Sequence, residues 1–257
     1  GENGIGIEDA MQGRVRIIGD PFDRFGEDRL RILRVPRFHS QHSMLHIATI
    51  LDDRTREAMA YYGDLRKPVK RHNDGQMLQP VSGERIQQEF LRGIQKARFL
   101  PHYLETYYQL GLLPSVFPEL KVCDRIQALS LVSRNPVVIL AHLLRHNQPS
   151  FVRKVLTACN WPNEITDEVQ FILNVRAVLA KEGWTAADIV PWTEKIGIKP
   201  ERRGHLQEFL LVLEESEVDP VDWFHLQQYE PEYIDGEALM REHNVSGPAV
   251  GKLKLSM

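Results

Sequence analysis

The stretch that decides how this chain is interpreted is residues 24–38, here called the arginine-rich segment, which read Arg24-Phe25-Gly26-Glu27-Asp28-Arg29-Leu30-Arg31-Ile32-Leu33-Arg34-Val35-Pro36-Arg37-Phe38. Apolar residues recur in it at helical spacing, which predicts one α-helix from Asp23 to about Phe38. On that helix Asp28 and Arg31 are neighbours, and Arg34 and Arg37 follow in three-residue steps that drift gradually round the axis. Pro36 should kink the helix, because proline lacks the backbone N–H that a helix interior uses.

Asp28 and Arg31 combine a hydrogen-bond acceptor with several donors. A carboxylate can accept from the exocyclic amine of a base, and a guanidinium can donate to ring nitrogens and carbonyl oxygens, so the pair could read the edge of a nucleotide base. Arg34 and Arg37 would then meet phosphates. The spacing alone favours a simpler interpretation, an ordinary ion pair on a solvent-exposed helix.

The flanking sequence predicts further short elements. Residues 14–18 have the pattern of a terminal strand, which Gly19-Asp20-Pro21 stops. Helices are expected over residues 55–62, after Asp52-Asp53, and from Ser82 onward. The basic stretch 66–75 should be an exposed loop, either a phosphate contact or simply solvated. After residue 97 one helix should follow another, with an acidic linker at 216–222.

Composition narrows the class of protein. The chain has 257 residues, 42% of them apolar and 26% charged, which is typical of a folded globular protein. Its two cysteines exclude a disulfide framework, and no apolar run is long enough for a bilayer helix, so we expect a cytoplasmic protein with no membrane partner. Residues 1–100 carry 17 basic and 14 acidic side chains, a surplus of +3, and the remaining residues carry 15 and 21, a balance of −6. This basic excess is too small to indicate a dedicated nucleic-acid binder.

Four segments, in order, resemble the class II tRNA nucleotidyltransferase (CCA-adding enzyme) and bacterial poly(A) polymerase family. The matching segments are Gly19-Asp20-Pro21 with the arginine-rich segment, Ser82-Gly83-Glu84-Arg85-Ile86 continuing to Glu89-Phe90, residues 111–120, and Ile234-Asp235-Gly236-Glu237-Ala238-Leu239 followed by Gly247-Pro248. The resemblance implies a mainly α, elongated, multi-helix fold with a short N-terminal strand remnant. It divides the chain into the end of a catalytic head sheet (1–22), a neck (23–97), a helical body (98–215) and a helical, truncated tail (216–257).

The resemblance also implies roles for individual residues. Asp28 and Arg31 would select the base, and Arg34 and Arg37 would hold nucleotide or RNA phosphate. Side chains expected to brace the base-binding helix are Glu27, Glu84, Arg85 and Glu89. Further RNA contacts are expected from Arg66, Lys67, Lys70 and Arg71.

The family reaction adds CMP or AMP from CTP or ATP to the 3′ end of tRNA or another RNA, with two Mg²⁺ ions held by an Asp-x-Asp pair. This chain contains no Asp-x-Asp, begins at Gly1, and has in residues 4–9 what looks like the end of the motif that joins head to neck. We therefore expect it to bind no metal and to be inactive alone, with the head missing or on a separate polypeptide. The alternative is a non-catalytic RNA-binding or partner-docking module. The neck residues do not distinguish addition of CC, A, CCA or poly(A).

Other patterns have simpler explanations. His42 with His46, and His142 with His146, have a spacing that could hold zinc, but neither pair has a third ligand beside it, so structural or surface roles are favoured. The aromatic residues at 103, 107 and 108, with His102, could stack on RNA bases, yet their spacing is more typical of a core. Cys159 beside Trp161 indicates a buried thiol.

Overall fold

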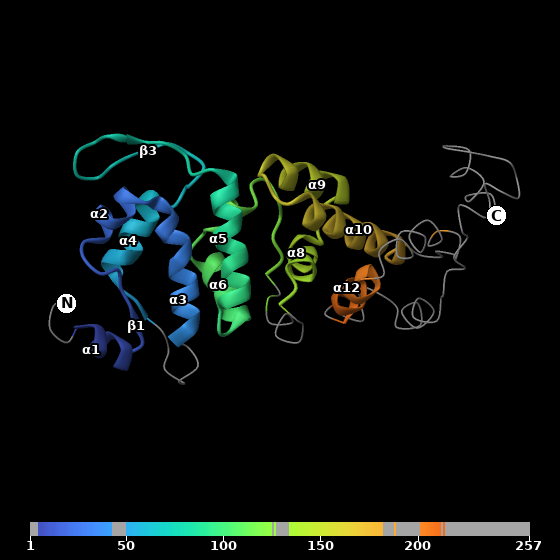
Figure 1. The fold of residues 1–257 in the computed structure, drawn as a ribbon, viewed down its shortest axis with the longest axis horizontal. Coiled ribbons are helices and arrows are strands. Elements are labelled where there is room, and N and C mark those ends of the chain that lie inside the picture. The colour runs from blue at the N-terminus through green and yellow to red at the C-terminus, as the bar shows by residue number, and fades with distance from the viewer. Residues whose placement is uncertain are drawn as a thin grey trace, which may run out of the picture. The chain divides into compact units, whose positions relative to one another are not determined.

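The computed structural model describes residues 5–42, 50–124, 126, 134–181, 188, 201–211 and 213. The chain forms two compact units, residues 1–170 and 171–257. Helices dominate the described residues, which confirms the mainly α prediction (Figure 1). The helices are α1 Ile5–Met11, α2 Pro21–Glu27, the 3-10 helix η1 Arg29–Arg34, α3 Val35–His42, α4 Asp53–Tyr62, α5 Gly83–Lys96, α6 Leu100–Gln109, α7 Leu113–Val116, α8 Pro136–Leu144, α9 Pro149–Ala158, α10 Asn163–Leu179 and α12 Glu201–Leu210.

The arginine-rich segment is not the single helix that its periodicity predicts. It is divided among α2, η1 and α3, and the break comes at Asp28, whose backbone is extended (φ −150°, ψ 100°). The Asp28 carboxylate accepts a hydrogen bond from the N–H of Leu30 at 3.2 Å, so it caps η1. Aspartate is among the preferred N-cap residues because its side chain satisfies such an N–H group. Capping therefore prevails here over continuous helical periodicity.

This division changes how the arginines are arranged. A 3-10 helix has three residues per turn, so Arg31 and Arg34 lie on one face of η1 instead of drifting round the axis. Both are half-buried, whereas Leu30, Ile32 and Leu33 are buried beneath them. The predicted kink at Pro36 is wrong, because this proline occupies the first turn of α3, where no intrahelical N–H is needed.

The strands are short. They are β1 Arg14–Val15, β2 Ile50–Leu51, β3 Val69–Lys70 and β4 Met77–Leu78. β1 pairs in parallel with β2, so the strand predicted over 14–18 is confirmed only at its start. β3 and β4 pair antiparallel, so the predicted basic stretch 66–75 contains one strand and the turn of a β-hairpin. Most of its residues are exposed, as predicted.

The helices expected after Asp52 and Ser82 are confirmed together with their caps. The Asp52 carboxylate accepts from the N–H of Thr55 at 3.0 Å, and the Ser82 hydroxyl accepts from the N–H of Arg85 at 3.4 Å. The predicted linker, the tail motif and His46 lie outside the described residues. The predicted boundaries of head, neck, body and tail stay predictions.

An aromatic core joins α5, α6 and the segments that follow them. Phe90 contacts Tyr107 edge-on at 5.2 Å and Phe117 at 5.3 Å between ring centroids, and Phe117 stacks on Trp161. The Tyr107 hydroxyl donates to the carbonyl of Leu33 at 2.9 Å, which ties α6 to η1. Burial raises the pKa of Tyr107, so the hydroxyl stays a donor. Tyr103 and Tyr107 are thus core residues, whereas Tyr108 is 52% exposed.

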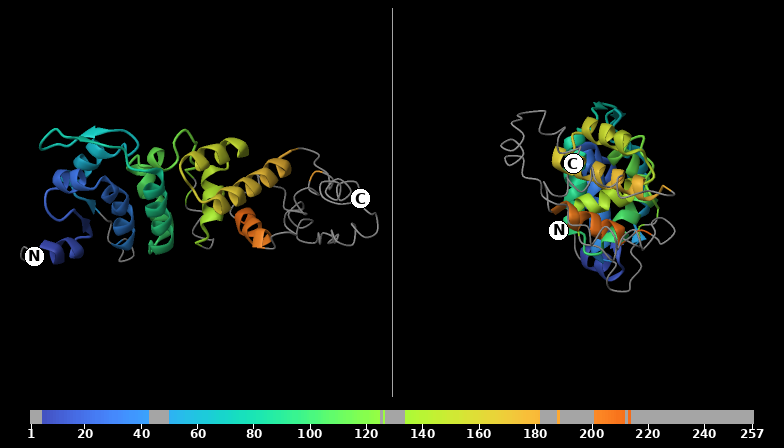
Figure 2. Two further views of the ribbon diagram at one scale, coloured as in Figure 1. Left: turned by 45° about the horizontal axis from the view of Figure 1, so that its top comes forward. Right: turned by 90° about the vertical axis from the view of Figure 1, so that its right-hand side faces the viewer.

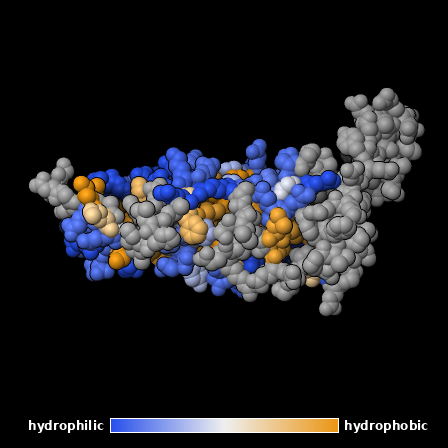
Figure 3. Space-filling view, turned by 90° about the horizontal axis from the view of Figure 1, so that it is seen from below, coloured by the Kyte–Doolittle hydropathy of each residue, from blue (hydrophilic) through white to orange (hydrophobic). Residues whose placement is uncertain are grey.

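The surface of the described residues is mainly hydrophilic. On the face in Figure 3, hydrophobic side chains form separate areas rather than one continuous surface. No helix within the described ranges has the length and apolar character needed to cross a bilayer.

We predict that Gly93→Ala destabilises the first unit strongly. A Cβ at Gly93 would lie 2.0 Å from the Tyr103 hydroxyl oxygen, and Tyr103 is buried and donates to the carbonyl of Phe90. Overpacking of this kind costs about 1–3 kcal/mol, and we expect at least about 2 kcal/mol. Urea denaturation measures it. Gln95→Ala, at an exposed position on the same helix, should stay within about 0.5 kcal/mol of wild type. Equal stabilities for the two variants would contradict this packing.

Candidate functional site

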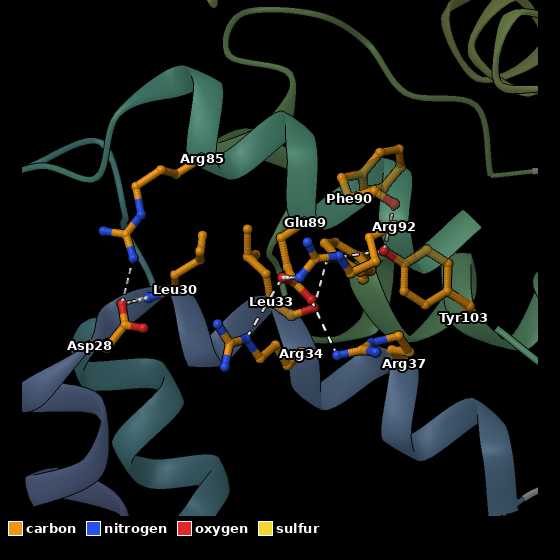
Figure 4. Close-up of polar contacts among 11 residues, drawn as sticks. Asp28, Leu30, Leu33, Arg34, Arg37, Arg85, Glu89, Phe90, Arg92 and Tyr103 are labelled. Carbon is orange, nitrogen blue, oxygen red and sulfur yellow. Dashed lines mark hydrogen bonds and ion pairs between the residues drawn. The ribbon is translucent and has the colours of Figure 1, made fainter. Parts of the chain in front are cut away.

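Asp28 lies where α2 gives way to η1, with its carboxylate turned toward α5 (Figure 4). One oxygen, Oδ1, accepts both from Leu30 and from the Arg85 guanidinium at 3.2 Å. The side chain is 26% exposed. Both contacts use Oδ1, and within the described residues no hydrogen bond joins Oδ2 to another group.

Arg31 is held by a different carboxylate. Its Nη1 donates to Glu27 at 2.7 Å and to the carbonyl of Arg24 at 3.0 Å. Arg24 also donates to Glu27, at 2.6 Å. The hydrogen bond from Arg31 lowers the pKa of Glu27, and the charges of Arg24 and Arg71 add to the effect. The expected contact between Asp28 and Arg31 is thus replaced by one between Glu27 and Arg31. Within the described residues, no hydrogen bond joins Nε or Nη2 of Arg31 to another group.

Glu89 projects from α5 toward the arginine-rich segment (Figure 4). Its carboxylate is 3% exposed and forms ion pairs with Arg34 at 3.7 Å, Arg37 at 3.4 Å and Arg92 at 3.6 Å. A buried carboxylate is costly unless opposite charges compensate it. Glu89 therefore fixes η1 and α3 against α5.

A second anchor is Arg29, which is 4% exposed. Its guanidinium donates to the carbonyls of Lys67 at 2.8 Å, Gln79 at 3.3 Å and Tyr62 at 3.2 Å, and also to that of Asp64. Burial lowers the pKa of Arg29, although the charge of Asp64 opposes this. These bonds fasten the chain on both sides of the β-hairpin to the start of η1.

The other predicted residues lie in several environments. Glu84 accepts from Gln88 on its own helix, and within the described residues no contact joins it to the arginine-rich segment. Arg66 donates to the carbonyl of Ser115 at 2.7 Å and is half-buried. Lys67 pairs with Asp64 at 2.9 Å, and Lys70 is exposed.

Sequence reasoning missed two contributors. Arg29 was given no role from the sequence, because a buried guanidinium that donates to four carbonyls has no local sequence signal. Arg92 is three residues beyond Glu89 on α5, so its ion pair with Glu89 could have been found from helical spacing.

In the part of the chain that the structure describes, no group of three or more His, Cys, Asp or Glu side chains could hold a metal ion. His142 is buried and accepts from Arg145 at 3.0 Å, which agrees with a structural role. Cys159 is buried as predicted, and burial raises the pKa of its thiol. The described residues therefore do not fit a magnesium centre.

Comparison with known proteins gives this geometry a context. No family model matches the chain. A CCA-adding enzyme of Lactobacillus helveticus is 26% identical over 181 residues, which are 65% of this chain and 39% of that protein. A CCA-adding enzyme of Bacillus velezensis is 34% identical over 108 residues, which are 42% of this chain and 23% of that protein. The sequence is thus similar to these CCA-adding enzymes over part of its length. It spans less than half the length of these two CCA-adding enzymes.

Solved CCA-adding enzymes share the fold. The Bacillus stearothermophilus enzyme in complex with CTP aligns with 98% of this chain and 61% of its own, at TM-score 0.61 and 20% identity. A CCA-adding enzyme in complex with ATP aligns with 97% of this chain and 59% of its own, at TM-score 0.58 and 17% identity. The Thermotoga maritima enzyme complexed with tRNA aligns with 97% of this chain and 60% of its own, at TM-score 0.56 and 16% identity. At these identities the likeness concerns the fold alone.

We predict that Glu89→Gln destabilises the first unit, because it leaves the three arginines without their shared counter-charge. Breaking a buried pair costs about 3–5 kcal/mol, and partial exposure of Arg34 and Arg92 should bring the loss toward about 2–3 kcal/mol.

The matched control is Glu84→Gln on the same helix, which is exposed and should change stability by about 0.5 kcal/mol at most. Chemical denaturation of both variants measures the difference. Similar stability for Glu89→Gln and Glu84→Gln would show that Glu89 does not hold η1 and α3 to α5.

Proposed function

We propose that this chain supplies nucleotide-base recognition and RNA binding to an RNA 3′-end nucleotidyltransferase of the CCA-adding type. The observation that carries the proposal is the pair of unused edges on η1. Asp28 keeps Oδ2, and Arg31 keeps Nε and Nη2, while their other polar atoms hold the side chains in position. An acceptor and a two-donor edge from one short helix suit a base that offers an amine beside ring acceptors.

In this proposal Asp28 accepts from the exocyclic amine that cytosine and adenine share. Arg31 donates to the ring nitrogen and, in cytosine, to the carbonyl oxygen. Uracil and guanine offer a carbonyl oxygen where the other two bases carry the amine, so Asp28 disfavours them. Relatives bound to CTP and to ATP support these two nucleotides as substrates.

Phosphate binding is assigned to arginines on the same segment. Arg34 is 38% exposed and contacts Glu89 through Nε, so its two Nη groups can reach a phosphate. Arg37 is 16% exposed and pairs with the buried Glu89, so in this proposal it mainly holds the segment in place and binds phosphate less than Arg34 does. RNA phosphates are further assigned to the exposed Lys67 and Lys70. The relative bound to tRNA supports an RNA partner.

The transfer step needs groups beyond those described. In the proposed reaction the RNA 3′-hydroxyl attacks the α-phosphate and pyrophosphate leaves, and Mg²⁺ supplies the charge stabilisation. The carboxylates that would hold Mg²⁺ are assigned to a catalytic head outside these 257 residues. This chain contributes the selection of the base and the hold on the RNA. The relatives reported above are named CCA-adding enzymes, which favours CCA over poly(A) addition.

The test is nucleotide preference. Asp28→Ala removes the acceptor for the exocyclic amine, so the preference of the chain for CTP and ATP over UTP and GTP should fall about 5- to 150-fold, as for the loss of one base contact worth about 1–3 kcal/mol. Arg34→Ala should weaken the binding of all four nucleotides by a similar factor, because a phosphate contact carries no information about the base.

Equilibrium binding of the four nucleotides to wild type and both variants measures this, with melting temperature as the control for folding. If both folded variants lose all four nucleotides equally, Asp28 does not read the base. Equal wild-type affinity for all four nucleotides would favour the alternative, a non-catalytic RNA-binding or partner-docking module.

A further inference from the structure

The β3–β4 hairpin is a closed structure that carries Arg71 at its turn. Arg71 donates its backbone N–H to the carbonyl of Gln76 at 2.7 Å and accepts from the N–H of Gly75 at 2.9 Å. Gly75 has a φ of +69°, which glycine adopts without strain. The position of Arg71 is thus set by the hairpin backbone.

The hairpin is docked on α2 and α4 (Figure 2). The ring centroids of His72 and Phe22 lie 4.4 Å apart, and the backbone N–H of His72 donates to the Tyr62 hydroxyl at 2.8 Å. Asn73 donates to the Asp23 carboxylate, and the Tyr61 hydroxyl donates to the carbonyl of Lys70 at 3.1 Å. These contacts come from residues on either side of Arg71, so the hairpin holds it firmly beside α2.

Gly26 provides the space into which Arg71 fits. A Cβ at Gly26 would lie 3.1 Å from Cγ of Arg71 and 3.2 Å from the Tyr62 hydroxyl. The aliphatic stem of Arg71 therefore passes directly over Gly26, next to Glu27 in the chain. Any larger residue at position 26 would displace that stem.

The Arg71 guanidinium joins an arginine group that already surrounds Glu27. Arg24 and Arg31 donate to this carboxylate, and the charge of Arg71 acts on it as well. Arg71 pairs through Nη1 with Asp74 at 2.9 Å, whereas its Nε is buried without a hydrogen-bond partner. The buried Nε atoms of Arg29, Arg34 and Arg37 also lack a hydrogen-bond partner within the described residues, so what distinguishes Arg71 is its place beside the other arginines at Glu27.

We propose that Arg71 is a further phosphate-binding residue of the nucleotide site. The hairpin positions it there, and the absence of a side chain at Gly26 leaves room for its stem. The proposal rests on the proposed function, since Arg31 is its neighbour across Glu27. The ligand chemistry is a phosphate group, because guanidinium groups in this number match phosphate geometry and charge. The phosphate belongs either to the nucleoside triphosphate or to the RNA 3′ end.

The experiment measures binding of CTP, and separately of an RNA minihelix with a single-stranded 3′ end, to the full chain. Arg71→Met keeps the stem over Gly26 and removes the charge, and Arg71→Lys restores a charge. Arg56→Met removes an exposed charge from the neighbouring helix α4 and serves as the matched control. Gly26→Ala keeps the arginine and shifts its stem.

We expect Arg71→Met to weaken binding of one ligand about 10-fold or more, with partial recovery in Arg71→Lys and little change in Arg56→Met. Loss confined to CTP assigns the triphosphate, and loss confined to the minihelix assigns the RNA backbone. Gly26→Ala should weaken the same ligand as Arg71→Met, which keeps the test decisive if Arg71→Met fails to fold. The proposal is overturned if wild type binds both ligands and neither Arg71→Met nor Gly26→Ala changes them. If wild type binds neither ligand, the proposed function itself fails.

Discussion

The buried carboxylate of Glu89 is the constraint on which the site depends. With 3% of it exposed, it has to be neutralised from within the protein, and its partners come from α3, η1 and α5 itself. These ion pairs hold the arginine-rich segment against α5. From α6, the Tyr107 hydroxyl donates to the carbonyl of Leu33 in the same segment. Packing and charge compensation thus act on the same 3-10 helix.

The consequence for function is a division of labour within six residues of chain. The protein interior holds one side of η1, since its apolar residues Leu30, Ile32 and Leu33 are buried and Arg29 donates to four carbonyls. Asp28 and Arg31 are each fixed through one atom, by Arg85 and Glu27, and in the proposed function their remaining polar atoms would meet the ligand. A site fixed in this way loses little side-chain entropy when a nucleotide binds.

Helices α4 and α5 and their caps could be predicted from local sequence, because Asp52 and Ser82 each stand immediately before a helical pattern. The arginine-rich segment could not, since Asp28 is a good N-cap inside a stretch that is also helical in period, and tertiary contacts decide between the two. Its charges at 28, 31 and 34 recur every three residues, a weak sign of a 3-10 turn. The hairpin was missed because its docking depends on Phe22, Tyr62 and Gly26, which are distant in sequence.

The central claim is that Asp28 and Arg31 meet the base of a nucleotide. The most direct measurement is chemical-shift mapping of the isotope-labelled chain with CTP, following the Arg31 side-chain Nε–H and the backbone amides of residues 28–34. The account predicts saturable shifts centred on these signals, reproduced by ATP and much smaller with UTP at the same concentration. Shifts confined to other parts of the chain, or identical shifts with all nucleotides, would contradict it.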